Sequence, residues 1–175
     1  LSTVLRCLFN QITLQVVAPN ATALANALPE VSLGSLTPTL LAALCEQLKT
    51  EGTVARGEIS FDGLRALLIG GGPTSQTLWE EAGSLGLPLR LTWGMSEAAS
   101  QLCTQVTPAP PLTPIPPLPF VEVSTYLSAL SEKEGRAKSR LSVSGPLLEG
   151  GQLVTGDEGW VNERGVVISG RSNDM

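Results

Sequence analysis

The sequence predicts a mixed α/β fold with helices, followed by a small antiparallel β subdomain. The first hundred residues alternate apolar, β-branched stretches with stretches of helical periodicity, which is typical of a parallel or mixed sheet covered by helices. The last fifty-odd residues hold short strand candidates separated by turn residues. Between them lies a run of prolines, which neither a helix nor a central strand tolerates. The 175 residues are enough for one domain or two small subdomains.

Helices in the first part of the chain are marked by their capping residues. Thr37 precedes Pro38 and a leucine-rich stretch that ends at Gly52, and threonine suits an N-cap, proline the first helical turn and glycine the end. Ser75 is the expected N-cap of a helix that runs to residue 85. Two further helices are expected over residues 1–9 and 21–28.

Strands are expected where apolar or β-branched residues alternate between turn signals. The expected strands cover residues 12–18, 31–33, 64–69, 87–93, 120–125, 139–144, 152–155 and 166–169. The expected organisation is a partial α/β subdomain over 1–103, a proline-rich connection over 104–119, and a small β subdomain over 120–175. An alternative for the prolines is a polyproline II ligand of an SH3-type partner, although no basic residue flanks them.

Composition excludes several classes of function. The net charge is −5 and no basic stripe is visible, so a nucleic-acid partner is not expected. The chain has no histidine, which rules out a Ser-His-Asp triad, a histidine metal site and a histidine general base within it. Cys7, Cys45 and Cys103 form no CxxC pair, so reduced thiols of a cytoplasmic protein are expected. No run of 18 apolar residues exists, so no membrane span is expected.

Three candidate loops follow expected strands, where ligands bind in open α/β sheets. The first holds Gly70, Gly71 and Gly72, whose missing side chains let the backbone approach a flat ligand. A plain turn into the next helix is the alternative.

The second loop runs through Trp93, Gly94, Met95, Ser96 and Glu97. A hydroxyl beside a carboxylate can bind a phosphate and Mg²⁺ together, because the hydroxyl donates to a phosphoryl oxygen and the carboxylate binds the cation. The alternative is a helix N-cap with an acidic residue in the first turn.

The third loop joins Thr155, Gly156 and Asp157 to a later Gly170-Arg171 step. An aspartate can accept hydrogen bonds from both hydroxyls of a ribose, and an arginine can reach the sugar or a phosphate. A Gly-Asp turn in a hairpin with a surface arginine is the alternative.

Taken in order, the segments GGGP, WGMSE, TGDEGW and GRSND resemble the motifs of the adenylate-forming (AMP-dependent) acyl-CoA synthetase superfamily, along nearly the whole chain. The opening LSTVLRCLFNQITLQVV and the GRSND segment are most similar to the o-succinylbenzoate–CoA ligases. The resemblance implies an internal fragment of the large N-terminal domain of such an enzyme.

The resemblance also implies a role for each matching position. Gly70, Gly71 and Gly72 would lie along the adenine and the acyl pocket, and Gly94 and Met95 would belong to the nucleotide-binding loop. Trp93 stands in place of the usual tyrosine that stacks on adenine.

The remaining roles concern phosphate, metal, ribose and hinge. Ser96 replaces a threonine that contacts the α-phosphate, and Glu97 would help to hold Mg²⁺; these two are the catalytic candidates. Asp157 would accept from the ribose hydroxyls, and Arg171 would contact the ribose or a phosphate. The hinge to a mobile C-terminal domain would lie at Asn173 and Asp174.

The activity implied by the resemblance is that of an acid–thiol ligase. It would use ATP and Mg²⁺ to convert a carboxylic acid, o-succinylbenzoate, to an acyl-adenylate and then to the CoA thioester, in menaquinone or phylloquinone biosynthesis. Alternatives are another acyl- or aryl-CoA ligase and a non-catalytic nucleotide-binding module. The superfamily's phosphate loop and lysine-bearing C-terminal domain have no match in the sequence, so the fragment alone is expected to be inactive. A homodimer is one possible assembly.

Overall fold

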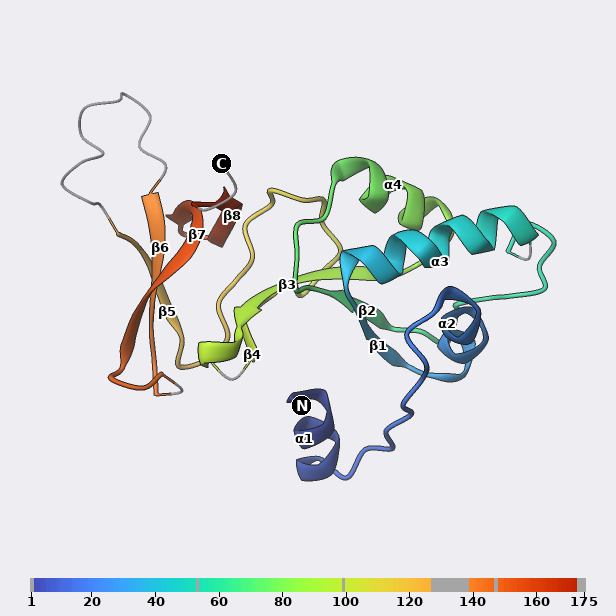
Figure 1. Cartoon of the computed structure of the whole chain (residues 1–175), viewed down its shortest axis with the longest axis horizontal. Coiled ribbons are helices and arrows are strands. Elements are labelled where there is room, and N and C mark those ends of the chain that lie inside the picture. Colours follow the sequence, from blue (N-terminus) through green and yellow to red (C-terminus); the bar gives the residue numbers. More distant parts are fainter. Residues whose placement is uncertain (1, 53, 99, 127–138, 147, 173–175) are drawn as a thin grey trace. The chain divides into compact units, whose positions relative to one another are not determined.

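The computed structural model describes residues 2–52, 54–98, 100–126, 139–146 and 148–172 (Figure 1). The chain divides into two compact units, Leu1–Leu89 and Arg90–Met175. It combines parallel and antiparallel pairing in its first four strands with a separate four-stranded antiparallel sheet, so the predicted α/β class is confirmed. The expected division into segments that end at residues 103 and 119 was based on changes in sequence pattern, and it remains a prediction.

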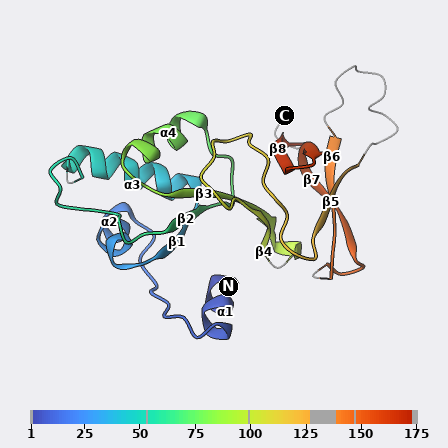
Figure 2. The ribbon, with the colours of Figure 1, turned by 180° about the vertical axis from the view of Figure 1, so that it is seen from behind.

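The first unit contains helices around a parallel strand pair. Its elements are α1 (Ser2–Phe9), α2 (Ala21–Ala27), the 3₁₀ turn η1 (Leu28–Glu30), β1 (Leu33–Leu36), α3 (Pro38–Glu51), β2 (Ala66–Ile69) and α4 (Gln76–Ser84). Strands β1 and β2 run parallel, with Leu33 opposite Ala66. Helix α3 contacts both α2 and α4, as the view from behind also shows (Figure 2).

The predicted caps of the first unit are confirmed. The Thr37 hydroxyl accepts the N–H of Leu40 at 3.3 Å, and the Ser75 hydroxyl accepts the N–H of Leu78 at 3.1 Å. Gly52 ends α3 with a left-handed φ of 61°. The core lies under this helix and includes Leu41, Leu44, Cys45 and Leu48 from α3 and Leu67 and Ile69 from β2, all at most 1% exposed.

The expected strand over residues 12–18 is wrong. These residues form neither helix nor strand, and Ile12 and Val16 are 56% and 83% exposed. A strand needs a neighbour for its backbone groups and a buried face for its alternate side chains, and the described part of the chain offers this segment neither.

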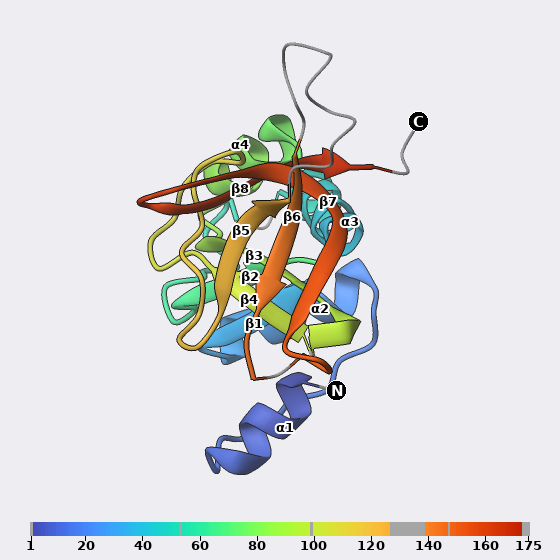
Figure 3. The same ribbon diagram turned by 90° about the vertical axis from the view of Figure 1, so that its left-hand side faces the viewer.

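The second unit is built almost entirely of strands. Its elements are β3 (Leu89–Met95), which starts at the last residue of the first unit, the 3₁₀ turn η2 (Ser96–Ala98), β4 (Ser100–Thr104), β5 (Glu122–Tyr126), β6 (Ser139–Ser144), β7 (Gln152–Asn162) and β8 (Gly165–Arg171). Strands β3 and β4 are antiparallel, and β5-β6-β7-β8 is an antiparallel sheet in that order (Figure 3). Strand β4 was not expected from the sequence.

The proline-rich segment is packed against and hydrogen-bonded to strand β8 of the second unit. Ile115 is 5% exposed and exchanges two backbone hydrogen bonds with Val166, at 2.8 and 3.0 Å. Leu112 has a left-handed φ of 65°, and the N–H of Thr113 donates to Pro110 in a turn. A positive φ and a turn break the polyproline II helix, so the structure argues against the SH3-ligand alternative.

The buried core of the second unit draws on β3, η2, β4, β6 and β8 and on the segments that connect strands. Its buried members are Trp93, Ala98, Leu102, Cys103, Ile115, Val121, Leu141, Val143, Leu148 and Val166. Among the helices of the described residues the longest, α3, has 14 residues, and none has both the length and the apolarity of a membrane span.

Candidate functional site

Three of the predicted site residues meet at the carboxylate of Asp157. The indole Nε1–H of Trp93, from β3, donates to Asp157 Oδ2 at 2.8 Å. Arg171 stands directly opposite Asp157 in the β7–β8 register, with its Nε 3.7 Å from Oδ1. The fold therefore brings together side chains that are 64 residues apart in the chain.

Burial differs sharply among the three side chains. Trp93 is 8% exposed, whereas the side chains of Asp157 and Arg171 are 22% and 67% exposed. A short hydrogen bond to a carboxylate in a partly buried place is among the stronger ones, whereas a long, solvated ion pair contributes little. The bond from the tryptophan is therefore the stronger of the two contacts to the carboxylate, and the arginine contact is the weaker, solvated one.

The backbone around Asp157 is held on both sides. Its N–H donates to the hydroxyl of Thr155 at 3.1 Å, and Thr155 is 5% exposed. The N–H and the hydroxyl of Ser172 both donate to the carbonyl of Gly156, at 2.9 and 3.0 Å. The expectation that Asp157 lies in a loop after a strand is wrong, since Asp157 lies inside β7. Cross-strand pairing with β8 overrides the local turn signal of the Gly-Asp step.

A register shift flanks each partner of the Trp93–Asp157 pair. The β3–β4 register shifts between Trp93 and Gly94, and the β7–β8 register shifts between Glu158 and Gly159. At both glycines the opposite strand leaves no room, since a Cβ on Gly94 would lie 1.8 Å from Ser100 O and one on Gly159 2.0 Å from Val167 O. Such register shifts can re-aim neighbouring side chains, and Trp93 and Asp157 each lie within one residue of one.

Ser96 and Glu97 follow β3 directly, but the expectation that the loop already includes Trp93, Gly94 and Met95 is wrong, since β3 extends to Met95 by pairing with β4. Ser96 and Glu97 are exposed and lie in the turn η2, while Met95 ends β3 and is half-buried. Across the described residues no three His, Cys, Asp or Glu side chains cluster to enclose a metal ion. Mg²⁺ is commonly bound by one or two carboxylates together with substrate phosphates. The exposed carboxylate of Glu97 could serve as one such ligand.

The triple glycine lies in the first unit, between β2 and α4. The N–H of Gly70 donates to Leu36 O at 3.2 Å, and Gly71 has a left-handed φ of 80°. Gly71 and Gly72 are exposed beside Thr37 and Pro38 at the start of α3. The loop also leads into the Ser75 cap, as the plain-turn alternative requires. The hinge candidates Asn173 and Asp174 lie outside the described residues.

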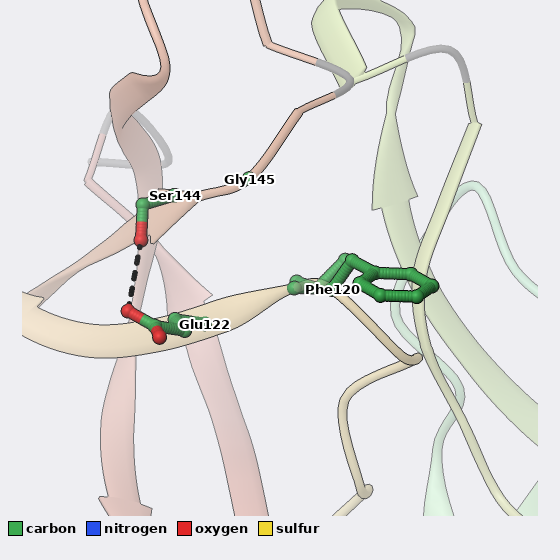
Figure 4. A pocket seen from close by; sticks show the side chains of 5 residues that line it. Phe120, Glu122, Ser144 and Gly145 are labelled. Carbon is green, nitrogen blue, oxygen red and sulfur yellow. Dashed lines mark hydrogen bonds between the residues drawn. The ribbon is translucent and has the colours of Figure 1, made fainter.

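A pocket of about 380 Å³ lies at residues that were not among the predicted site residues: Phe120, Val121, Glu122, Ser144 and Gly145. The Ser144 hydroxyl donates to Glu122 Oε2 at 3.5 Å, while the Phe120 ring points away from this pair (Figure 4). Phe120 is 84% exposed with a φ of 67°. No sequence signal marks a strained aromatic residue, because its backbone angle follows from the packing around it.

Cys45 and Cys103 are not candidates for catalysis. Burial raises the pKa of Cys103 to about 12. Burial, and secondarily Glu81, raise the pKa of Cys45 to about 11. The thiolate is the reactive form, so both thiols are inert near neutral pH.

Comparisons with known proteins bear on the predicted resemblance. No protein-family model matches the chain. It is 30% identical to the 2-succinylbenzoate–CoA ligase of Bacillus mycoides (strain KBAB4), in an alignment of 168 residues that covers 83% of this chain. The chain spans 32% of the length of that relative.

Its fold matches two solved structures of o-succinylbenzoate coenzyme A synthetase from Bacillus subtilis. One is a complex with AMP, with a TM-score of 0.69 and 23% identity, covering 99% of this chain and 48% of that one. The other is a complex with ATP and magnesium, with a TM-score of 0.69 and 22% identity, covering 99% of this chain and 39% of that one. The predicted resemblance is confirmed in sequence by the relative and in fold by the structures.

Proposed function

We propose that this chain, similar in sequence and fold to a region of the AMP-forming o-succinylbenzoate–CoA ligases, carries the ribose-binding carboxylate of such an enzyme. The observation that carries the proposal is the Asp157 carboxylate, hydrogen-bonded to Trp93 and paired with an exposed arginine. A carboxylate held this way can accept hydrogen bonds from a vicinal diol. The chain spans 32% of its curated relative, so the activity of the whole enzyme is part of the proposal.

Different residues of the described chain would bind different groups of the nucleotide. The ribose hydroxyls would donate to Asp157, and Arg171, which is 67% exposed, could swing from Asp157 to a phosphate oxygen. The Ser96 hydroxyl would donate to the α-phosphate, and Glu97 would hold Mg²⁺ together with the phosphates. The bound cation would neutralise negative charge on the phosphates.

The proposed reaction has two steps. A carboxylate oxygen of the acid, o-succinylbenzoate, attacks the α-phosphorus of ATP, the bond to pyrophosphate breaks, and an acyl-adenylate forms. The thiolate of CoA then attacks the acyl carbon and AMP leaves, which gives the thioester. The chain's contribution is to position the nucleotide and to stabilise charge rather than to form a covalent bond. The proposed setting is menaquinone biosynthesis in the cytoplasm, where ATP and CoA are available.

Thermal stability in the presence of AMP or Mg·ATP tests the proposal. A ligand that binds only the folded state at a hundred times its Kd stabilises it by about 2.7 kcal/mol. The wild-type chain should gain melting temperature, Asp157→Ala should lose that gain, and Asp62→Ala, which removes an exposed aspartate, should keep it. No gain at millimolar nucleotide, or an undiminished gain in Asp157→Ala, would contradict the ribose-binding role.

The choice of acid needs a second measurement. Non-hydrolysable adenylates that carry an o-succinylbenzoyl, a benzoyl or a fatty acyl group should stabilise the whole enzyme to different degrees. The largest shift is expected for the o-succinylbenzoyl compound. A larger shift with another acyl group would instead support the alternative of a different acyl- or aryl-CoA ligase.

A further inference from the structure

We infer that the outer edge of β5 is a pairing surface for a second copy of this chain, joined antiparallel about a twofold axis at Ser124. Strand β5 stands at the end of its four-stranded sheet, with β6 on one side (Figure 3). Within the described residues, neither a strand nor an isolated bridge occupies its other side. The backbone N–H and C=O groups on that side therefore suit the addition of another strand.

Strand β5 lacks the features that usually protect the edge of a sheet. Natural edge strands commonly carry lysine, proline or a bulge. The sequence of β5 is EVSTY, and its pairing with β6 runs without a register shift. Strand β8 at the other end of the sheet differs, because Ile115 exchanges two backbone hydrogen bonds with Val166 there. The edge of β5 is therefore the one that remains available for pairing in the described part of the sheet.

The sequence of β5 selects one register for pairing with itself. A twofold axis perpendicular to the sheet keeps each side chain on its own face, so residues opposite each other must lie an even number of positions apart. An axis at Ser124 satisfies this condition and pairs the whole strand. Glu122 then lies opposite Tyr126 of the second copy, so no like charges meet. Val123 lies opposite Thr125, which joins two β-branched side chains.

The same register brings an aromatic side chain to the pocket of about 380 Å³ at the start of β5. In this pocket the side chains of Glu122 and Ser144 face each other (Figure 4). Tyr126, at the opposite end of β5, is 47% exposed. Directly opposite residues of an antiparallel pair have Cβ atoms about 5 Å apart, so each Tyr126 would lie beside Glu122 of the other copy.

The phenol of Tyr126 suits this position chemically. The carboxylate of Glu122 accepts a bond of 3.5 Å from the Ser144 hydroxyl and has capacity for a further donor, the phenol O–H. The twofold axis generates this contact twice, so a second copy supplies both tyrosines, which an unrelated strand would supply only by coincidence. A single short strand makes a small interface, so the dimer is expected to be weak and reversible.

Sedimentation velocity of the chain, at concentrations from about 1 to 500 µM, tests the inference. The wild-type chain should form a reversible dimer. Ser124→Lys and Ser124→Glu each place like charges opposite each other at the axis and should weaken the dimer at least about tenfold. An equimolar mixture of these two variants should restore association as a heterodimer. Tyr126→Phe should weaken the dimer at least about fivefold, because two hydrogen bonds are lost.

A matched control places the same charge elsewhere. Ser84→Lys, at an exposed position of α4, should leave the dimer within about twofold. A wild-type chain that stays monomeric at about 500 µM would overturn the inference. A dimer that Ser124→Lys leaves intact would overturn it as well, since that dimer would use another surface.

The mixing experiment decides the register. Two monomeric Ser124 variants that do not associate when mixed would overturn the pairing about this residue. Should circular dichroism show that these variants do not fold, Tyr126→Phe decides, and a dimer of unchanged strength in that variant would refute the pairing. The measurement needs no nucleotide, so its outcome is separate from that of the proposed function.

Discussion

Replacing Gly94 with alanine should destabilise the second unit strongly, although it adds only one methyl group. Gly94 lies at the register shift between β3 and β4, opposite Gln101 in β4. The new Cβ would lie 1.8 Å from Ser100 O, 2.6 Å from Ser100 C and 2.7 Å from Gln101 Cα. All three are backbone atoms, so no side chain can rotate away to relieve the contact.

The size of the effect follows from the displacement that this contact requires. Real Cβ contacts essentially never fall below 3.0 Å, and the new Cβ would lie only 1.8 Å from Ser100 O. The backbones of the two strands must therefore move apart by about 1 Å or more at this point. A hydrogen bond of about 2.9 Å does not survive such a shift, and the Gly94–Gln101 and Met95–Ser100 pairs would be lost. At about 0.5–1.5 kcal/mol for each net hydrogen bond, plus disturbed packing of Trp93, the expected loss is about 2–4 kcal/mol.

Urea unfolding followed by tryptophan fluorescence measures this loss. A Trp79→Phe background removes the tryptophan of the first unit, so Trp93 and Trp160 report on the second. Gly170→Ala is the matched control, because a Cβ there meets nothing within 4 Å, and it should change stability by less than about 0.5 kcal/mol. A Gly94→Ala chain as stable as Gly170→Ala would refute the close approach of β3 and β4 on which the site geometry depends.

Three further predictions concern the core, a cap and a thiol. Leu44→Ala, at a fully buried position, should cost the first unit about 2–5 kcal/mol by Trp79 fluorescence, against less than about 1 kcal/mol for Leu33→Ala at a position that is 52% exposed. Thr37→Ala should cost about 1 kcal/mol in the same assay and Thr37→Ser much less, since serine also caps; equal losses would contradict the cap. Burial raises the pKa of Cys103 to about 12, so above about pH 9 the unfolded chain loses this proton while the folded chain keeps it. Stability should therefore fall between pH 9 and 11, by at most about 1.4 kcal/mol per pH unit from this thiol; an unchanged slope in Cys103→Ala would refute this source.

Features set by neighbours in the sequence could be predicted from it. Thr37 and Ser75 cap helices because their hydroxyls reach backbone groups three residues away, a contact that any packing of the helices would allow. Gly52 ends α3 for a similar local reason. The order of the four motif segments is likewise a property of the chain alone, and the resemblance that it predicted is confirmed in sequence by the relative and in fold by the solved structures.

Features that depend on distant partners could not be predicted in this way. Residues 12–18 have the pattern of a strand, but a strand exists only beside another one. Strand β4 has a weaker pattern and forms because β3 is there to pair with it. The same limit applies to the site: the sequence identified Trp93 and Asp157 as separate candidates, and nothing local joins residues 64 apart.

The sequence by itself therefore determined which residue types are available for nucleotide chemistry and in which order they occur. The tertiary structure decided how they are used. The packing of the second unit brings the indole of Trp93 to Asp157, and the pairing of β7 with β8 places Arg171 opposite it. The physical reason is that a hydrogen bond depends on distances of a few tenths of an ångström, and only the packed backbone sets those distances.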